Sequence, residues 1–320
     1  MDVIILCHTE FGRVYDKEII FDKNSIQGVK KGVFNLIKIA NSYGAKVTFA
    51  TMPETVESFP NDTTPHEIGL HIHPGWVKWN SHKKFQWYVG DSYLNNHCTY
   101  KINSTVLQDY SYKNQLEIIK TGKEYVENKL EKKIKSFVSG RWSVNNETIK
   151  ALIQLGITNE CSAQAHSKSD HYDWSKLPRI CMPYHPSEND YQKKGNLPIL
   201  ILPISQMLRI GNVNPEIAPI SGLSWLKACF LEYYRQDLPL FHICLHSPSM
   251  TDKFFISTME KLLKFISKHD NINFKCASEI KEYKNISPQT KLLPYIIATN
   301  RHITKTYLKG LLKRTAGVTK

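Results

Sequence analysis

The sequence predicts an α/β protein with a parallel β-sheet, arranged either as a barrel or as an open sheet. Short apolar runs alternate along the chain with longer amphipathic segments of helical period, and this alternation is typical of βαβ units. No glycine-rich phosphate loop follows any predicted strand, which weakens the case for a dinucleotide-binding sheet.

Apolar runs of strand length account for the predicted sheet. Several of them, such as residues 3–6, lack the apolar–polar alternation of a half-exposed strand, so we expect strands that are buried on both faces. The predicted strands are residues 3–6, 45–50, 67–73, 134–139, 157–161, 197–204, 238–245 and 272–276.

The segments between these strands carry the apolar spacing of amphipathic helices. In residues 25–42, for example, Val29, Val33 and Leu36 recur three or four residues apart, and the pattern stops before Gly44, a residue that commonly ends a helix. The predicted helices are residues 25–42, 112–130, 145–155, 225–234 and 253–269.

Residues 76–111 do not fit this alternation, because they are polar and aromatic without a clear period. A connection of this length without secondary structure is often a loop that covers a substrate. We therefore expect one domain, residues 1–286, in which this loop passes over one end, followed by a separate tail of residues 287–320.

Composition indicates a globular protein of a reducing compartment. Hydrophobic residues make up 41% of the 320 residues, which is enough for a sizeable core. The seven cysteines are scattered and form no CxxC pair, which indicates free thiols rather than a disulfide framework. We see no signal peptide and no apolar run long enough to span a membrane, so we expect a cytoplasmic protein.

The formal charge of +13 is partly concentrated in the tail. Basic residues alternate there with apolar ones, and this pattern suggests an amphipathic segment that could lie on an anionic membrane surface, at the inner face of the membrane. Nucleic acid is the less favoured partner, because no zinc finger, basic zipper or RNA-binding signature is present. The basic residues of the tail are Lys291, Arg301, Lys305, Lys309, Lys313, Arg314 and Lys320.

Titratable side chains end several of the predicted strands. His71 and His73 are two residues apart, so they share one face of a strand and could each give a nitrogen to one metal ion. Two unrelated polar residues at a strand end are the alternative. His8 and Glu10 have the same spacing at the end of the first strand, and His246 follows a later one.

In a parallel barrel the active site lies at the carboxyl ends of the strands. One carboxylate and two histidines with an open position make a catalytic type of divalent metal site, and a histidine opposite could protonate a leaving amine or alcohol. For His246 taken alone, a hydrogen-bonded structural histidine is the favoured interpretation.

The ordered set of these segments resembles the polysaccharide deacetylases, also known as the NodB-homology or carbohydrate esterase family 4 group. The likeness covers residues 3–280 and fits the branch with a His-x-His-Pro metal motif. It is carried by TFA (48–50), HEIGLHIHP (66–74), SFVSGRWS (136–143), MPYHPS (182–187), ILILPI (199–204), LHS (245–247) and FKCASEI (274–280).

The resemblance implies an irregular (β/α)7 barrel with outer helices and a metal-dependent hydrolase that removes an acyl group from a sugar, acting on amide rather than peptide bonds. Glu10, His71 and His73 would bind one divalent ion, for which we expect Zn²⁺ before Co²⁺, Ni²⁺ or Mn²⁺. His246 would be the general acid and Arg141 an orienting group. The side chains expected to contact the substrate are Trp76, Trp142, Trp174 and Tyr184.

Two departures from the family affect these expectations. The family opens with an aspartate that serves as general base, whereas this chain has His8, which could act as the base, serve as a fourth ligand or mark a loss of activity. The family's arginine commonly stands at the position of Val138 rather than Arg141.

The leading hypothesis is deacetylation of a nucleotide sugar, a lipid-linked sugar or a glycan precursor. A carbohydrate-binding or scaffold protein that has lost turnover is the main alternative. A membrane-bound protein that acts chiefly through its tail is a third.

Overall fold

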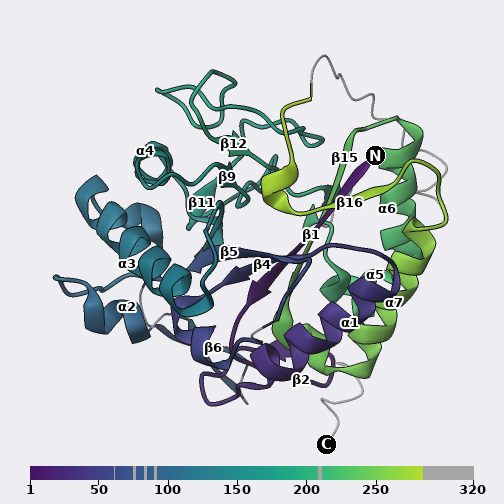
Figure 1. Ribbon diagram of the computed structural model, residues 1–320, viewed down its shortest axis with the longest axis horizontal. Helices are drawn as coiled ribbons and strands as arrows, with labels where there is room; N and C mark the ends of the chain where they lie inside the picture. The colour runs from purple at the N-terminus through teal and green to yellow at the C-terminus, as the bar shows by residue number, and fades with distance from the viewer. Residues whose placement is uncertain (61, 75–76, 83–84, 90–91, 208–210, 284–320) are drawn as a thin grey trace, which may run out of the picture.

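A parallel sheet of eight strands forms the centre of the computed structural model (Figure 1). The structure describes all residues except 61, 75–76, 83–84, 90–91, 208–210 and 284–320. The strands are β1 (Asp2–Thr9), β4 (Thr48–Thr51), β5 (Glu67–Ile72), β8 (Ser136–Ser139), β9 (Asn159–Glu160), β12 (Leu200–Ile201), β15 (Leu240–His246) and β16 (Asn273–Lys275).

The strands follow one another around the sheet in the order β12-β9-β8-β5-β4-β1-β15, and β16 pairs with the start of β1. Every pairing in this sheet is parallel. Seven strands thus curve into a half-barrel with helices around it, and the predicted (β/α)7 fold is confirmed. All eight predicted strands occur, although residues 197–204 shorten to the two residues of β12.

The strands are buried on both faces, as their apolar runs predict. Ile4 and Leu6 belong to an inner cluster that fills the half-barrel, whereas Val3, Ile5 and Cys7 pack outward. All of these side chains are inaccessible to solvent. Because the side-chain period of a strand is two, the inner face of β1 continues from Ile4 and Leu6 to the residues at its carboxyl end.

Helices cover the outside of the strands on two sides (Figure 1). In the view of Figure 1, α1, α6 and α7 lie to the right of β1, and α2, α3 and α4 lie to the left. The α-helices are α1 (Phe34–Ser42), α2 (Ser92–His97), α3 (Tyr112–Leu130), α4 (Asn146–Gln154), α5 (Ala218–Ser221), α6 (Leu223–Arg235) and α7 (Lys253–Ile266).

Local sequence explains where the long helices begin. The Ser111 hydroxyl accepts a hydrogen bond from the backbone of Asn114 and caps α3. Asn145 and Thr148 form a reciprocal capping box at α4, and such caps satisfy backbone N–H groups that have no partner inside the helix. The helix predicted for residues 25–42 differs in its first turns, where η1 (Gly28–Val33) is a π-helix before α1 begins.

The prediction of a loop without secondary structure at residues 76–111 is wrong. This segment contains the hairpin β6 (Val77–His82) and β7 (Phe85–Val89), then α2 and the short 3₁₀ helix η3 (Leu107–Asp109). Aromatic and β-branched residues do recur at every second position in β7. This alternation is typical of a strand, but it spans only the five residues of β7.

Other short strands form antiparallel pairs outside the parallel sheet. They are β2 (Arg13–Tyr15) with β3 (Glu18–Ile20), β10 (Lys168–Ser169) with β11 (Tyr172–Asp173), and β13 (Gln206–Met207) with β14 (Gly211–Asn212). The remaining 3₁₀ helices are η2 (Pro53–Ser58), η4 (Gly140–Trp142), η5 (Pro215–Ile217), η6 (Ser247–Thr251) and η7 (Ala277–Glu279).

A polar network closes the amino-terminal end of the half-barrel. The Glu67 carboxylate accepts hydrogen bonds from the Thr48 and Ser136 hydroxyls, at 3.0 and 2.7 Å. It also accepts one from the backbone of Ser278 in η7, at 3.0 Å. Because Ala277 of η7 packs in the inner cluster, this end of the half-barrel is plugged, and the opposite end remains for a site.

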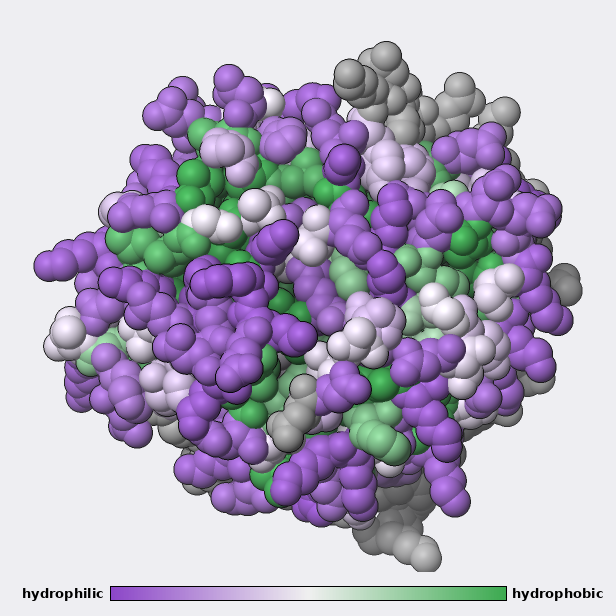
Figure 2. Space-filling view, in the orientation of Figure 1, coloured by the Kyte–Doolittle hydropathy of each residue, from purple (hydrophilic) through white to green (hydrophobic). Residues whose placement is uncertain are grey.

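Hydrophilic residues cover most of the face seen in Figure 2, and hydrophobic side chains show mainly in the gaps between them. Among the residues that the structure describes, no helix has the length and apolar character needed to cross a membrane. The predicted tail, residues 287–320, lies outside the described residues.

Candidate metal centre and active site

The register between β1 and β15 brings two histidines together at the carboxyl end of the sheet. His8 is the direct partner of His246 in this parallel pairing. Both side chains point to the inner face, since His8 follows Ile4 and Leu6 at intervals of two residues. Their ring centroids are 4.8 Å apart in an edge-to-face arrangement.

Glu10, His71 and His73 meet beside this pair. The Glu10 Oε1 atom lies 3.0 Å from His71 Nε2 and 3.4 Å from His73 Nε2. All three side chains are buried. The structure therefore brings together the three residues for which the sequence predicts metal ligation.

His71 also has a hydrogen-bond partner at its second ring nitrogen, and this partner determines what can lie between His71 and Glu10. His71 Nδ1 lies 3.0 Å from the carbonyl oxygen of Val138, its neighbour across the β5–β8 pairing. A carbonyl only accepts, so Nδ1 carries a proton, and a neutral His71 has only a lone pair at Nε2. Two acceptors would then face each other across 3.0 Å unless a cation, either a proton or a metal ion, lies between them.

The spacing of the donor atoms fits a metal ion. Tetrahedral zinc with bonds of about 2.05 Å separates its ligand atoms by about 3.3 Å, close to the distances from Glu10 to the two imidazoles. Donor atoms of His8, Glu10 and His71 also lie within 4.8 Å of one another. A metal-binding histidine usually donates its second N–H to a carbonyl or carboxylate, as His71 does.

Charges and burial shift the pKa values of these groups. Burial alone would raise the pKa of Glu10, but its close contacts with the His71 and His73 rings outweigh burial and hold it well below its ordinary value. Burial lowers the pKa of His73 to about 4, although the Glu10 carboxylate opposes this effect. At neutral pH the site thus offers a carboxylate and a neutral imidazole, the forms in which these groups bind metals.

His8 is enclosed by other rings and by a thiol. Its ring centroid lies 4.6 Å from that of His71 and 5.0 Å from that of Trp142. Its Nε2 atom lies 3.5 Å from the Cys244 Sγ atom on the inner face of β15. Burial lowers the pKa of His8 well below 6.5, and the nearby His71 and His246 lower it further. His8 is therefore neutral at pH 7 and able to accept a proton.

His246 has the opposite charge state because of Glu216. The Glu216 carboxylate accepts hydrogen bonds from the His246 backbone and from its Nδ1 atom, the latter at 2.9 Å. Burial would lower the pKa of His246, but the charge and hydrogen bond of Glu216 raise it to about 9. Asn214 caps η5 and donates to the same carboxylate at 2.9 Å, so Glu216 is itself held in place.

Arg141 and Trp142 form an unusual turn directly after β8. Both have positive φ angles, 54° and 58°, a conformation that non-glycine residues seldom adopt. The turn brings the Trp142 ring against His8, and it leaves Arg141 Nη1 2.8 Å from His171 Nε2. Gly140, which precedes Arg141, packs so closely on His73 that a Cβ atom would lie 2.4 Å from the His73 Nδ1 atom.

The aromatic residues expected to contact the substrate occupy different positions. Trp142 is partly exposed beside His8. Trp174 is fully buried, and its Nε1 atom donates to the Trp142 carbonyl at 3.1 Å. Tyr184 is also buried and donates to the Tyr191 carbonyl. Contrary to our expectation, Trp174 and Tyr184 support neighbouring backbone and offer a substrate little or no surface. Trp76 lies outside the described residues.

Three residues of the site were not predicted from the sequence: Glu216, His171 and Cys244. Glu216 lies 30 residues before its partner His246, in a short turn without a periodic pattern. His171 reaches the site from a two-stranded hairpin. Only Cys244 had a signal, because it is two residues before His246 and therefore shares its face of β15.

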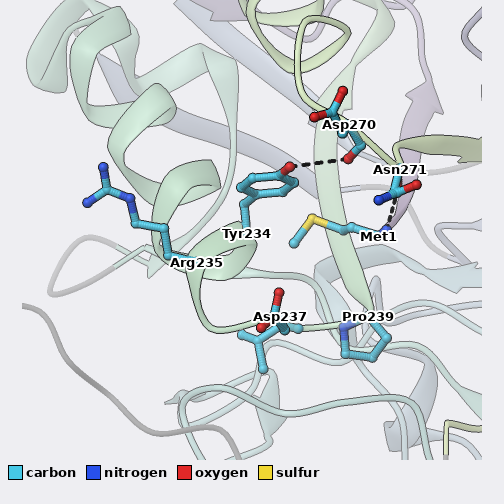
Figure 3. A pocket seen from close by; sticks show the side chains of 8 residues that line it. Met1, Tyr234, Arg235, Asp237, Pro239, Asp270 and Asn271 are labelled. Carbon is cyan, nitrogen blue, oxygen red and sulfur yellow. Dashed lines mark hydrogen bonds between the residues drawn. The ribbon is translucent and has the colours of Figure 1, made fainter.

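A pocket of about 320 Å³ lies at the other end of the sheet (Figure 3). It is lined by Met1, Pro239, the last residues of α6 and residues of the loops that follow α6 and α7. Tyr234 donates to the Asp270 carbonyl there, at 3.3 Å. Because Met1 precedes the eight residues of β1, about 26 Å of strand separates this pocket from His8 and Glu10. The pocket is therefore not part of the candidate site.

The fold is shared with proteins described as polysaccharide deacetylases, with an allantoinase and with a glucanotransferase. A protein described as a polysaccharide deacetylase from Mycobacterium smegmatis matches over 90% of this chain and 94% of its own, with a TM-score of 0.55 and 12% identity. The PuuE allantoinase (TM-score 0.53, 12% identity) matches over 87% of this chain and 88% of its own. A protein described as a polysaccharide deacetylase from Pseudomonas aeruginosa PAO1 (TM-score 0.52, 14% identity) covers the same shares.

A 4-α-glucanotransferase from Thermococcus litoralis has a TM-score of 0.51 and 13% identity, and the match spans 87% of this chain but 38% of the transferase. No family model matches the sequence, and no curated protein is significantly similar to it. The resemblance to polysaccharide deacetylases is thus confirmed at the level of the fold.

Gly140→Ala tests whether the turn after β8 holds His73 in place. The added methyl group would overlap the His73 ring, so we expect Zn²⁺ affinity to fall about 10- to 100-fold, as when other supporting contacts of metal ligands are lost. Chelator competition measures this change. Gly156→Ala is the control, because its φ of +71° causes backbone strain but no atom lies within 4 Å of the new Cβ. Equal affinities of Gly140→Ala and the parent would contradict the expected role of Gly140.

Proposed function

We propose that this protein is a metal-dependent hydrolase that removes an N-acetyl group, or another acyl or formyl group, from a sugar. The fold that it shares with proteins described as polysaccharide deacetylases supports this proposal. So do the donor set of Glu10, His71 and His73 and the histidine pair beside it.

The opposite charge states of His8 and His246 carry the proposal. Two imidazoles whose centroids are 4.8 Å apart have pKa values shifted in opposite directions, His8 downward and His246 to about 9. Adjacent titratable groups with separated pKa values are the arrangement that general acid–base catalysis requires. The contact with the Glu216 carboxylate keeps His246 charged beside a neutral His8, which supports a role of the pair in proton transfer.

Each residue then has a defined task. Glu10, His71 and His73 would hold the ion. A bound Zn²⁺ ion would polarise a carbonyl oxygen and lower the pKa of water. His8 would take the proton from the attacking water, and His246 would give its proton to the leaving amine nitrogen. Glu216 keeps His246 protonated for this step, and Arg141 orients the substrate.

The substrate that we propose is a nucleotide sugar, a lipid-linked sugar or another glycan precursor inside the cell. The basic tail, residues 287–320, would favour a lipid-linked substrate, because it could hold the protein at the anionic inner face of a membrane. We propose Zn²⁺ as the resident ion, since imidazole and carboxylate ligands suit it, and Co²⁺, Ni²⁺ or Mn²⁺ as substitutes.

Metal analysis is the first test of the proposed function. We expect elemental analysis of the purified protein to find about one divalent ion per chain, because the three ligands form one site. The double variant His71→Ala, His73→Ala should contain none. His66→Ala is a matched control, since His66 precedes the same strand but donates no atom to the site.

If parent and variant both lack metal after incubation with Zn²⁺, the proposed hydrolase is excluded. Metal in the parent alone justifies a screen of N-acetyl sugars for release of acetate.

Glu216→Gln tests the assignment of His246 as general acid. The acid must be protonated, so parental kcat/KM should fall as the pH rises through about 9. Without the Glu216 charge the pKa of His246 drops, and we expect the alkaline limb to move down by roughly one to three pH units. Glu147→Gln, at a surface ion pair with Lys150, should leave the limb in place. An alkaline limb that Glu216→Gln does not move would exclude His246 as the acid.

A carbohydrate-binding or scaffold protein is the alternative, and His8 is the observation that favours it, because deacetylases of the resembled family have an aspartate there. His8→Asp separates the two functions. If His8 is the working base, we expect kcat/KM to fall about 100-fold or more, the usual contribution of a general base, because a carboxylate beside charged His246 would pair with it. A large gain in rate would instead indicate an impaired enzyme.

A further inference from the structure

We propose that His171 is a positioning residue that holds the Arg141 guanidinium at the rim of the candidate metal centre. His171 lies in the connection between β10 and β11, outside the sheet. Its Nε2 atom is 2.8 Å from Arg141 Nη1. In one respect the inference rests on the proposed function, since the ligand that Arg141 orients there is the substrate.

The hairpin of β10 and β11 contacts the strained turn after β8 at two places. Besides the contact of His171 with Arg141, Trp174 donates from Nε1 to the carbonyl of Trp142 at 3.1 Å. The connection is braced internally, because the backbone of His171 donates to the Ser169 hydroxyl at 3.2 Å. The hairpin thus fixes both the backbone of the turn and the side chain that extends from it.

The hydrogen-bonding groups of Arg141 and His171 determine the protonation state of His171. A guanidinium only donates hydrogen bonds, so His171 Nε2 must be an unprotonated acceptor. A neutral acceptor fixes the guanidinium in place without cancelling its charge, as a carboxylate would. That charge is felt at the metal centre, where Arg141 contributes to lowering the pKa of His73. His171 therefore orients the guanidinium without itself placing a negative charge beside it.

The surroundings of His171 favour its neutral form. Burial lowers its pKa, and the Arg141 charge lowers it further, against the opposing charges of Asp170 and Asp109. Above its ordinary pKa near 6.5 the ring is neutral and the contact is intact. As the pH falls below that range, protonation removes the acceptor and places two cations side by side.

The first test needs no activity. In NMR titrations of the full chain, the His171 ring resonance, identified by its loss in His171→Gln, should report a pKa that rises by about one unit in Arg141→Met, since a neighbouring cation has been removed. Lys168→Ala is the control, because it breaks the ion pair of Lys168 with Asp173 in the same hairpin without removing the contact of His171. An unchanged His171 titration in Arg141→Met overturns the proposal.

The second test measures deacetylation of an N-acetyl sugar. His171→Phe should lower kcat/KM at least about tenfold, and combining it with Arg141→Met should cost no more than Arg141→Met alone. His171→Gln should retain most of the activity and lose the acid limb due to His171, because an amide oxygen accepts but does not titrate. Parental kinetics in His171→Phe overturn the positioning role.

The two proposals fail differently. A chain that hydrolyses no acyl sugar but still shows the coupled titration overturns the proposed function and supports the pair of Arg141 and His171. A chain that hydrolyses an acyl sugar but does not show the coupled titration supports the proposed function and overturns the pair of Arg141 and His171.

Discussion

The parallel pairing of β1 with its neighbours is the constraint on which the site depends. β1 is buried on both faces, so a slip of one residue would turn His8 and Glu10 outward and drive Ile5 inward. Its register with β15 places His8 opposite His246. The neighbouring register of β5 with β8 places His71 opposite Val138, whose carbonyl sets the imidazole tautomer. The core and the site are thus specified by the same pairings, and neither can change independently.

Sequence patterns identified the candidate site residues that the sheet carries, but they missed those that the loops contribute. The apolar runs identified every strand of the parallel sheet, and the strand period then identified His8, Glu10, His71, His73 and His246. Contacts between a strand end and a distant turn leave no period in the sequence, so Glu216 and His171 could not be found. The hairpin at residues 77–89 was missed because its strands are only six and five residues long and lie within a polar and aromatic segment.

The opposite shifts in the pKa values of His8 and His246, on which the proposed roles of base and acid rest, depend largely on the carboxylate of Glu216. Burial lowers the pKa of both imidazoles. For His246 the ion pair with Glu216, at 2.9 Å, is the main cause that reverses this effect, and the charge of Glu10 adds to it. Without that contact the pKa of His246 would fall, and less of it would be protonated at neutral pH. In the proposed reaction the turn Asn214–Glu216 is therefore as important as the strand that carries His246.

The turn after β8 has a strained backbone conformation next to the candidate site. Left-handed backbone at Arg141 and Trp142 costs roughly 1–2 kcal/mol per residue, a considerable share of the 5–15 kcal/mol by which a typical domain is stable. An ordinary turn would avoid this cost, but it would carry the Trp142 ring away from His8 and the guanidinium away from His171. The hydrogen bond from Trp174 and the close packing of Gly140 on His73 hold the turn in this form. Backbone strain that these two contacts maintain, next to a cluster of metal-ligand type, is the pattern expected of a functional position rather than of one that serves stability alone.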